Sequence, residues 1–211
     1  MPAVPLPRRP RDPGEDIRWW YEHELGWPTL PGTPLHLSVG SRFDVLDVPA
    51  EAGLAGLRHL APASPVAVQG DRMRLLVAPG SAEELPGVLD WLEWGGLRLD
   101  LRVVGGEGDG GAGGGAGRGG GRMPAPVPPG GAVAGRAGAG AAPVGGRFPR
   151  GAAVWLRPPE PGCEVEASLP TLSAMGGGGG APDLVRLVDT VAAYCHRIRL
   201  RRACVQPLAF S

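Results

Sequence analysis

Pro65-Val-Ala-Val-Gln-Gly-Asp-Arg-Met-Arg-Leu-Leu-Val-Ala78 is the stretch of this 211-residue sequence that decides the predicted fold. Its two apolar runs, residues 65–69 and 72–78, have the length and the Val and Leu content of short strands. Gly70 and Asp71 between them are typical of a tight turn, so the stretch predicts a β-hairpin. The segments on either side of it alternate between strand and helix patterns.

Three elements are predicted on the N-terminal side of the hairpin. A helix is expected over residues 15–25, with Gly26 as its stop. Residues 42–48 have a strand pattern that ends at Pro49, a residue suited to the first turn of a helix. A helix over residues 49–60 would then direct three leucines inward, at Leu54, Leu57 and Leu60.

Four elements are predicted on the C-terminal side. Ser81 and Glu84 have the spacing of a capping box and predict a helix start. Residues 97–103 alternate between apolar and charged side chains, which is typical of a strand with one buried face. Residues 152–156 form another strand pattern. The last helix starts near Asp183 and carries one apolar stripe, made of Leu184, Leu187, Val188, Val191, Cys195 and Ile198.

Because strands and helices alternate, the sequence predicts an α/β (α+β) fold with a mixed β-sheet flanked by helices. Nineteen of the 37 glycines lie in a Gly/Ala/Pro-rich tract over residues 105–149, which cannot bury enough apolar surface to fold. The expected organisation is therefore one core with a flexible insert: a Pro/Arg-rich tail over 1–13, core over 14–104, disordered insert over 105–149, the rest of the core with the C-terminal helix over 150–202, and a tail over 203–211.

Composition restricts the classes of function. The formal net charge is zero, which argues against a globally basic nucleic-acid binder, although a local basic patch is still compatible with it. All basic residues are arginine, as in a gene of very high GC content, so arginine enrichment alone says little about function. The three cysteines lack zinc-site spacing. Without a secretory signal or a membrane-length apolar run, we expect a cytoplasmic protein that has no membrane partner.

Two aspartates carry the strongest candidate chemistry. Two-metal nucleotidyl transfer needs carboxylates that hold divalent ions together, and Asp47 and Asp100 would meet if their strands are neighbours. The alternative is structural, with one aspartate capping a turn and the other in a surface ion pair with Arg98 or Arg102. Asp44 lies three residues before Asp47 and points to the opposite face of a regular strand, so these two cannot form a metal pair.

A cluster of arginines ends the last helix: Arg197, Arg199, Arg201 and Arg202. Guanidinium groups match phosphate oxygens, so the cluster could contact a phosphate. Cations at a helix C-terminus also stabilise the helix dipole without any partner. Both interpretations are open at this stage.

The order of motifs resembles the bifunctional primase–polymerase (Prim-Pol) N-terminal domain of the archaeo-eukaryotic primase superfamily. Four stretches carry the resemblance: Tyr21-Glu-His-Glu-Leu-Gly-Trp-Pro-Thr-Leu-Pro-Gly32, Phe43-Asp-Val-Leu-Asp-Val-Pro49, Gln69-Gly-Asp-Arg-Met-Arg-Leu-Leu-Val-Ala-Pro79, and Leu99-Asp-Leu-Arg102 with the segments Met123-Pro-Ala-Pro126 and Trp155-Leu-Arg-Pro-Pro159 beyond it. The resemblance covers about residues 16–159 and implies a primase–polymerase-like fold.

The catalytic motifs of that family are degenerate here. Asp47 matches the first acidic position, but Pro49 stands where the second acid is expected. Met73 or Arg74 stands near the position of the family's nucleotide-contacting histidine, and Asp100 matches the third acid. The resemblance with these departures implies a scaffold without polymerase chemistry and with no cofactor.

Three functions follow as expectations. The first is a catalytically inactive Prim-Pol-like protein that retains binding of a nucleotide, single-stranded DNA or a protein partner. The second is an active primase–polymerase, with Asp47 and Asp100 holding Mg²⁺ or Mn²⁺ and with phosphate contacts from Arg72, Arg74 and Arg102. The third is a regulatory protein-interaction module without a role at nucleic acid.

Overall fold

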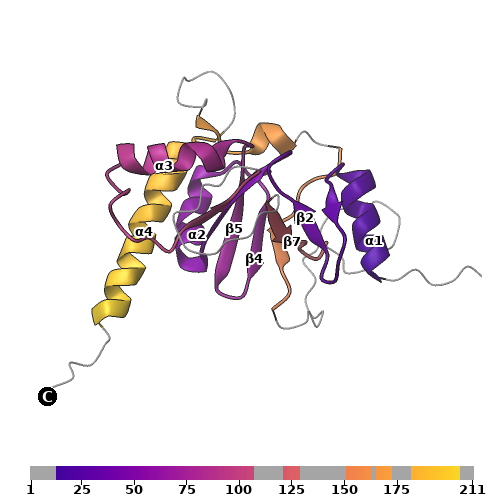
Figure 1. Cartoon of the computed structure of the whole chain (residues 1–211), viewed down its shortest axis with the longest axis horizontal. Helices are drawn as coiled ribbons and strands as arrows, with labels where there is room; N and C mark the ends of the chain where they lie inside the picture. The colour runs from indigo at the N-terminus through magenta and orange to yellow at the C-terminus, as the bar shows by residue number, and fades with distance from the viewer. Residues whose placement is uncertain (1–12, 107–120, 129–150, 163–164, 173–181, 205–211) are drawn as a thin grey trace, which may run out of the picture.

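A computed structural model of the protein describes residues 13–106, 121–128, 151–162, 165–172 and 182–204 (Figure 1). Most of the expected flexible segments, namely residues 1–12, 107–120, 129–149 and 205–211, lie outside the described residues.

The central element is a five-stranded sheet with the order β6-β3-β5-β4-β8. Every ladder between these strands is antiparallel. The predicted hairpin is confirmed, because β4 and β5 pair directly and Gly70 takes a positive φ of 59° in the turn. The bounds of the strands in sheet order are Arg102–Val104, Asp44–Pro49, Arg72–Val77, Val66–Gln69 and Val154–Arg157.

The first four strands of this sheet belong to one βαββαβ unit. Its chain order is β3, α2 (Ala50–Gly56), β4, β5, α3 (Ser81–Trp91) and β6. In the sheet, β6 lies beside β3, and β5 separates β3 from β4. This is the split βαβ arrangement. Helix α2 connects β3 to β4, with β5 between them in the sheet, and helix α3 connects β5 to β6, with β3 between them. The strand between each connected pair is antiparallel to both of its neighbours. The expectation of a mixed sheet is therefore wrong.

The helices α2, α3 and α4 (Leu184–Cys204) cover one face of this sheet (Figure 1). The predicted stripe of α4 is confirmed, because all six of its residues are buried in one cluster with the inward side chains of β3 and β5. Asp183 caps this helix, and its Oδ1 accepts the backbone N–H of Val185 at 2.9 Å. The core of the domain thus lies between the sheet and the helix layer.

A second, three-stranded sheet covers part of the opposite face, with the order β1-β2-β7. Its strands are Thr29–Leu30, His36–Ser38 and Arg122–Pro124. Strand β7 lies within the predicted disordered insert, so that prediction is wrong for residues 121–128. Met123 explains the difference, because its side chain is only 1% exposed and packs in a second apolar cluster with Trp27, Leu37 and Phe43.

The N-terminal helix changes type along its length. It is an α-helix over α1 (Pro13–Trp19) and a π-helix over η1 (Trp20–Glu24). Gly26 follows with a φ of 65°, as expected of a helix stop. Two short 3-10 turns complete the description, η2 (Leu57–His59) and η3 (Val165–Ser168).

Three local expectations are wrong for identifiable reasons. Leu54 is 58% exposed rather than inward, because the side of α2 that packs on the core carries the small residues Ala52, Gly53 and Gly56. Residues 97–101 form no ladder, although Leu99 and Leu101 still pack against the helix-side core. Ser81 makes no capping hydrogen bond to α3, because the helix is preceded by left-handed Gly80 and is capped from another strand.

Candidate functional site

Asp47 lies two residues before the end of β3, between arginines on both neighbouring strands. It is in direct register with Arg74 of β5 and with Arg102 of β6. Side chains that face each other across a ladder point to the same face of a sheet. The pairing therefore places three of the sequence-predicted site residues in one row across the sheet.

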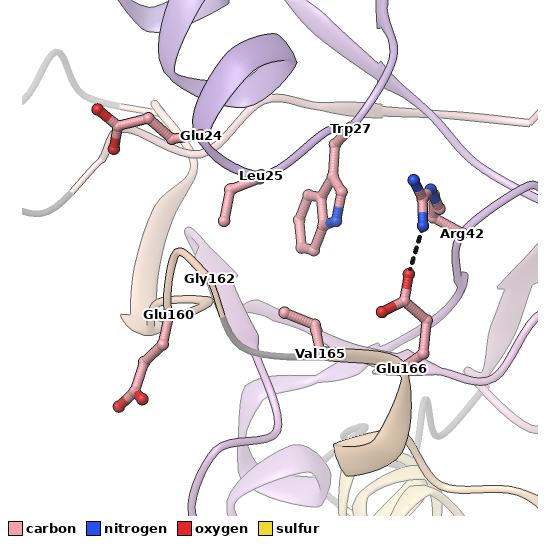
Figure 2. A pocket seen from close by; sticks show the side chains of 8 residues that line it. All are labelled: Glu24, Leu25, Trp27, Arg42, Glu160, Gly162, Val165 and Glu166. Atoms are coloured by element: carbon pink, nitrogen blue, oxygen red, sulfur yellow. Dashed lines mark hydrogen bonds and ion pairs between the residues drawn. The ribbon is translucent and has the colours of Figure 1, made fainter.

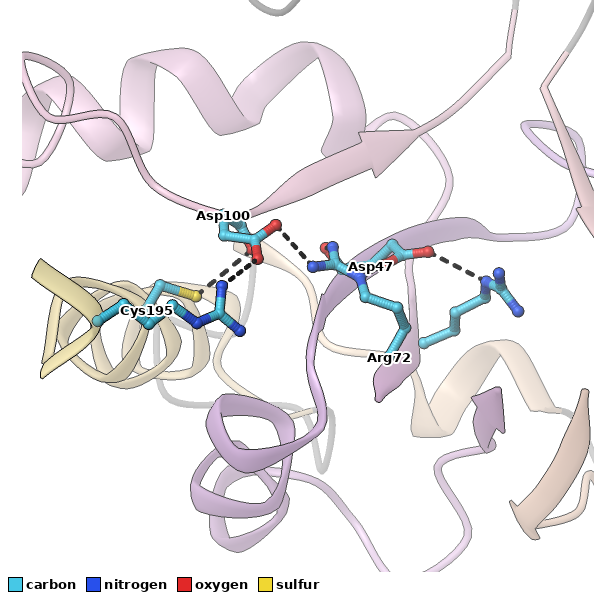
Figure 3. Close-up of polar contacts among 6 residues, drawn as sticks. Asp47, Arg72, Asp100 and Cys195 are labelled. Atoms are coloured by element: carbon cyan, nitrogen blue, oxygen red, sulfur yellow. Dashed lines mark hydrogen bonds and ion pairs between the residues drawn. The ribbon is translucent and has the colours of Figure 1, made fainter. Parts of the chain in front are cut away.

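Arg72 joins the two candidate carboxylates (Figure 3). Its Nε donates to Oδ1 of Asp47 at 2.6 Å, and its Nη1 donates to Oδ1 of Asp100 at 2.6 Å. Its Nη2 also donates to the backbone carbonyl of Asp47 at 2.9 Å. The fold thus brings Asp47 and Asp100 to the same arginine, whose guanidinium group lies between the two carboxylates.

Arg74 and Arg102, which flank Asp47 in the row across the sheet, differ in their exposure to solvent. Arg74 donates from Nε to Oδ2 of Asp47 at 3.1 Å, and its side chain is 13% exposed. Its Nη1 is buried and has no hydrogen-bond partner among the described residues. Arg102 is exposed on the edge strand. One arginine of the row is thus largely enclosed, and the other is open to a ligand.

Asp100 also contacts the C-terminal helix. Nη1 of Arg202 lies 3.8 Å from its Oδ2, and Sγ of Cys195 donates to its backbone carbonyl at 3.7 Å (Figure 3). Asp100 therefore pairs with Arg72 and Arg202, not with Arg98 or Arg102 as the structural interpretation expected. The arginine run at the end of α4 was the only sequence signal for Arg202.

Burial and charge set the ionisation of this cluster. Burial lowers the pKa of Arg72, but its hydrogen bonds and attraction to Asp47 and Asp100 outweigh this effect and raise the pKa overall. Burial raises the pKa of the Cys195 thiol to about 12, and the negative charge of Asp100 adds to the shift. Arg72 is thus held as a cation, and Cys195 is held as an unreactive thiol.

Arginine occupies the carboxylates that a two-metal centre would use. Both aspartates already accept hydrogen bonds from Arg72, and Pro49 of β3, which pairs with Arg72, supplies no side-chain ligand. The part of the chain that the structure describes contains no group of three or more His, Cys, Asp or Glu residues arranged to hold a metal ion. A divalent ion held by oxygen ligands would have to displace the guanidinium first.

Comparisons with known proteins add no relative. A scan against protein-family models and searches of curated proteins and of solved structures find no match to this chain. Within the described ranges, no helix combines the length and the apolar character that crossing a lipid bilayer requires.

Proposed function

We propose that this chain is a Prim-Pol-like domain that does not catalyse nucleotide transfer. The observation that carries the proposal is the position of Arg72, whose guanidinium donates to both Asp47 and Asp100. Together with Arg74 on Asp47 and Arg202 near Asp100, it balances the charge of both carboxylates, which weakens the electrostatic attraction of divalent ions to them. The split βαβ core, with both aspartates at one end of its sheet, supports the resemblance in the order of motifs.

In this proposal the cluster retains a binding role for a nucleotide or single-stranded DNA. Arg72, Arg74, Arg102 and Arg202 outnumber Asp47 and Asp100, so the end of the sheet has an excess of positive charge. Arg102 is exposed on the edge strand, and an exposed guanidinium suits contacts to phosphate oxygens.

A primer-synthesis and primer-extension assay with Mg²⁺ and with Mn²⁺ tests the absence of catalysis. The wild-type chain and Asp47→Ala are expected to give the same background incorporation. Template-directed incorporation by the wild type that is lost in Asp47→Ala would overturn the proposal. Circular dichroism of both proteins establishes that each is folded.

Binding of single-stranded DNA is tested separately by its salt dependence. Each phosphate contact releases counterions, so the logarithm of the affinity falls linearly with the logarithm of salt concentration. Arg102→Gln is expected to weaken binding and to lower this slope by about 0.7. Arg58→Gln, on η2 away from the cluster, is the matched control. Equal binding by the wild type and Arg102→Gln would contradict a phosphate contact by Arg102.

The second candidate is an active metal-dependent nucleotidyltransferase that uses Asp47 and Asp100 with Mg²⁺ or Mn²⁺. One observation favours it: the fold brings these two carboxylates to the same partner from segments 53 positions apart in sequence. Arg72 would then leave the carboxylates when the ions bind and contact the nucleotide phosphates. Under this alternative Arg72→Gln changes metal affinity, which Mn²⁺ titration of both proteins would measure.

The third candidate, a protein-interaction module without a role at nucleic acid, is favoured by the neutral net charge. Salt-dependent retention on single-stranded DNA by the wild type, together with its loss in Arg102→Gln, would count against it.

A further inference from the structure

A pocket of about 260 Å³ lies where three segments far apart in the sequence meet (Figure 2). Leu25 and Trp27 follow η1, Arg42 precedes β3, and Val165 and Glu166 begin η3. Trp27 and Val165 belong to the apolar cluster on the sheet face opposite to the helix layer. The pocket shares no lining residue with the aspartate and arginine cluster described above, so it is a separate candidate site.

The π-helix η1 shapes one side of this pocket. The backbone N–H of Leu25 donates to the carbonyl of Trp20 at 3.3 Å, five residues back, as a π-helix requires. The N–H of Trp27 then donates to the carbonyl of Tyr21 at 2.8 Å, so this wide turn holds Leu25 and Trp27 at the pocket. Single π-helical turns are rare and occur frequently at functional sites. The local backbone therefore supports a binding role for the pocket.

The polar groups that face the pocket are an indole N–H and an ion pair. Nη1 of Arg42 donates to Oε1 of Glu166 at 2.9 Å, and both side chains are exposed. Nε1 of Trp27 has no hydrogen-bond acceptor among the described residues. Figure 2 shows this nitrogen on the side of the ring that faces the ion pair, whereas the carboxylates of Glu24 and Glu160 point away from Trp27.

This combination of groups favours a ligand that carries both charges. Arg42 and Glu166 lie side by side, so a ligand with a single charge is attracted by one of them and repelled by the other. A zwitterion avoids the conflict. Its carboxylate can accept hydrogen bonds from Arg42 and from Nε1 of Trp27, while its ammonium group donates to Glu166.

The size and the apolar part of the lining restrict the ligand further. Pockets for small-molecule ligands are usually about 300–1,000 Å³, so this smaller pocket suits a ligand at the small end of that class. Leu25 and Val165 offer apolar contact beside the polar groups. A small zwitterion with an apolar remainder satisfies both requirements.

We propose that this pocket binds a free α-amino acid with an apolar side chain. Its carboxylate lies against Arg42 and the indole N–H of Trp27, its ammonium group lies against Glu166, and its side chain lies against Leu25 and Val165. An α-amino acid carries both charged groups on one carbon, which matches the adjacent guanidinium and carboxylate of the ion pair. The proposal involves no residue of the aspartate and arginine cluster, so it does not depend on the function proposed above.

An NMR titration of the ¹⁵N-labelled full chain tests the proposal through the indole N–H resonance of Trp27. L-Leucine, L-methionine and L-valine, each added up to about 10 mM, should shift this resonance in a saturable manner. Two analogues of leucine carry one charge each: 4-methylpentanoate lacks the ammonium group, and 3-methylbutylamine lacks the carboxylate. Both should bind at least about tenfold more weakly than L-leucine.

Two results of this titration would overturn the proposal. One is the absence of a saturable shift with all three amino acids. The other is equal affinity for L-leucine and for either analogue with a single charge, because the ion pair would then not recognise a zwitterion.

Substitutions in the ion pair identify the pocket as the site. Arg42→Gln removes the cation that faces the carboxylate, and Glu166→Gln removes the anion that faces the ammonium group. Each should raise the dissociation constant for L-leucine at least about tenfold, measured by the same titration. Because both side chains are exposed, both variants are expected to fold, which circular dichroism checks.

Arg201 and Glu51 provide the matched controls. They form a comparably exposed ion pair between α4 and α2, and neither lines the pocket. Arg201→Gln and Glu51→Gln should bind L-leucine as the wild type does. Wild-type affinity in folded Arg42→Gln or Glu166→Gln would overturn the proposal, as would an equal loss of affinity in the control variants.

Discussion

Arg72 holds Asp47 at two points, through the carboxylate and through the backbone carbonyl of the same residue. This double contact fixes the end of β3 against the start of β5 while the same guanidinium reaches Asp100. A single side chain thus ties two strands and the segment before β6 together. These contacts stabilise the packing of the strands, and this role of Arg72 does not depend on any ligand that the neighbouring arginines bind.

Removing Arg72 should therefore destabilise the fold. The side chains of Arg72 and Asp47 are only 20% and 16% exposed, so Arg72→Ala leaves a largely buried carboxylate with one charged partner fewer. We expect a loss of about 3 kcal/mol in the free energy of unfolding, measured by urea denaturation. Arg98→Ala, at an exposed position, should change stability by less than about 0.5 kcal/mol.

Coupling between Arg72 and Asp47 provides a stricter test. Adding Asp47→Ala to Arg72→Ala should cost much less than the sum of the two single variants, because the second substitution removes the carboxylate that the first leaves unpaired. Additive losses would show that the pair contributes nothing beyond the packing of each side chain.

Two glycines in different helices should respond oppositely to alanine. A Cβ at Gly53 in α2 would lie 2.5 Å from Sδ and 2.8 Å from Cβ of Met73 in the core, whereas a Cβ at Gly87 in α3 would meet no atom within 4 Å. We expect Gly53→Ala to destabilise by about 1–3 kcal/mol through overpacking. Gly87→Ala should stabilise by about 0.5–1 kcal/mol through helix propensity. Thermal and urea unfolding of both variants check the signs.

Tyr21 links the second sheet to the central one. Its hydroxyl donates to the carbonyl of Pro126 at 2.5 Å and accepts from Nε1 of Trp155 in β8 at 2.9 Å. Burial raises the pKa of Tyr21, although the hydrogen bond from Trp155 opposes the shift. Tyr21→Phe leaves both partners unsatisfied and should cost about 1–3 kcal/mol in urea denaturation.

The ionisation of Tyr21 gives an independent readout. In a spectroscopic pH titration Tyr21 should ionise only together with unfolding, because its hydroxyl is buried. Ionisation of Tyr21 in the native state would contradict the burial of its hydroxyl.

Asp44 should make stability depend on pH in an unusual direction. Its carboxyl is 1% exposed, and its Oδ2 accepts the backbone N–H of Ala82 at 2.9 Å, which caps α3. Burial raises the pKa of Asp44 above its ordinary 3.8, and hydrogen bonds from Ala82 and Gly80 only partly oppose this. The folded state therefore holds the proton to higher pH than the unfolded state, so Asp44 costs stability as pH rises from about 4 through its folded pKa.

Asp44→Asn keeps a capping oxygen without the charge. Relative to the wild type, this variant should gain stability as pH increases over that window, measured by urea denaturation at successive pH values. Asp44→Ala loses the cap and should be less stable than Asp44→Asn by about 1 kcal/mol. A stability difference between Asp44→Asn and the wild type that does not change with pH would contradict the raised pKa.

Periodicity and turn chemistry determined the local elements of this protein. The apolar stripe of α4 and the Gly70 hairpin could be predicted because each depends on neighbours a few residues apart in sequence. Asp47, Asp100 and the arginines were candidates for the same reason, since residue type and strand position are visible in the sequence. The roles of these residues could not be predicted, because an aspartate is identical in the sequence whether its carboxylate binds a metal ion or an arginine.

Long-range contacts decided the rest. The sheet is antiparallel because β5 lies between β3 and β4, which α2 connects, and β3 lies between β5 and β6, which α3 connects. Strand β7 forms in a Gly-rich tract because the side chain of Met123 is buried beside Leu37. The cap of α3 comes from Asp44, 38 positions before Ala82, rather than from Ser81. Only tertiary structure could place Arg72 between Asp47 and Asp100, because the energy of an ion pair depends on distance in space and not on distance along the chain.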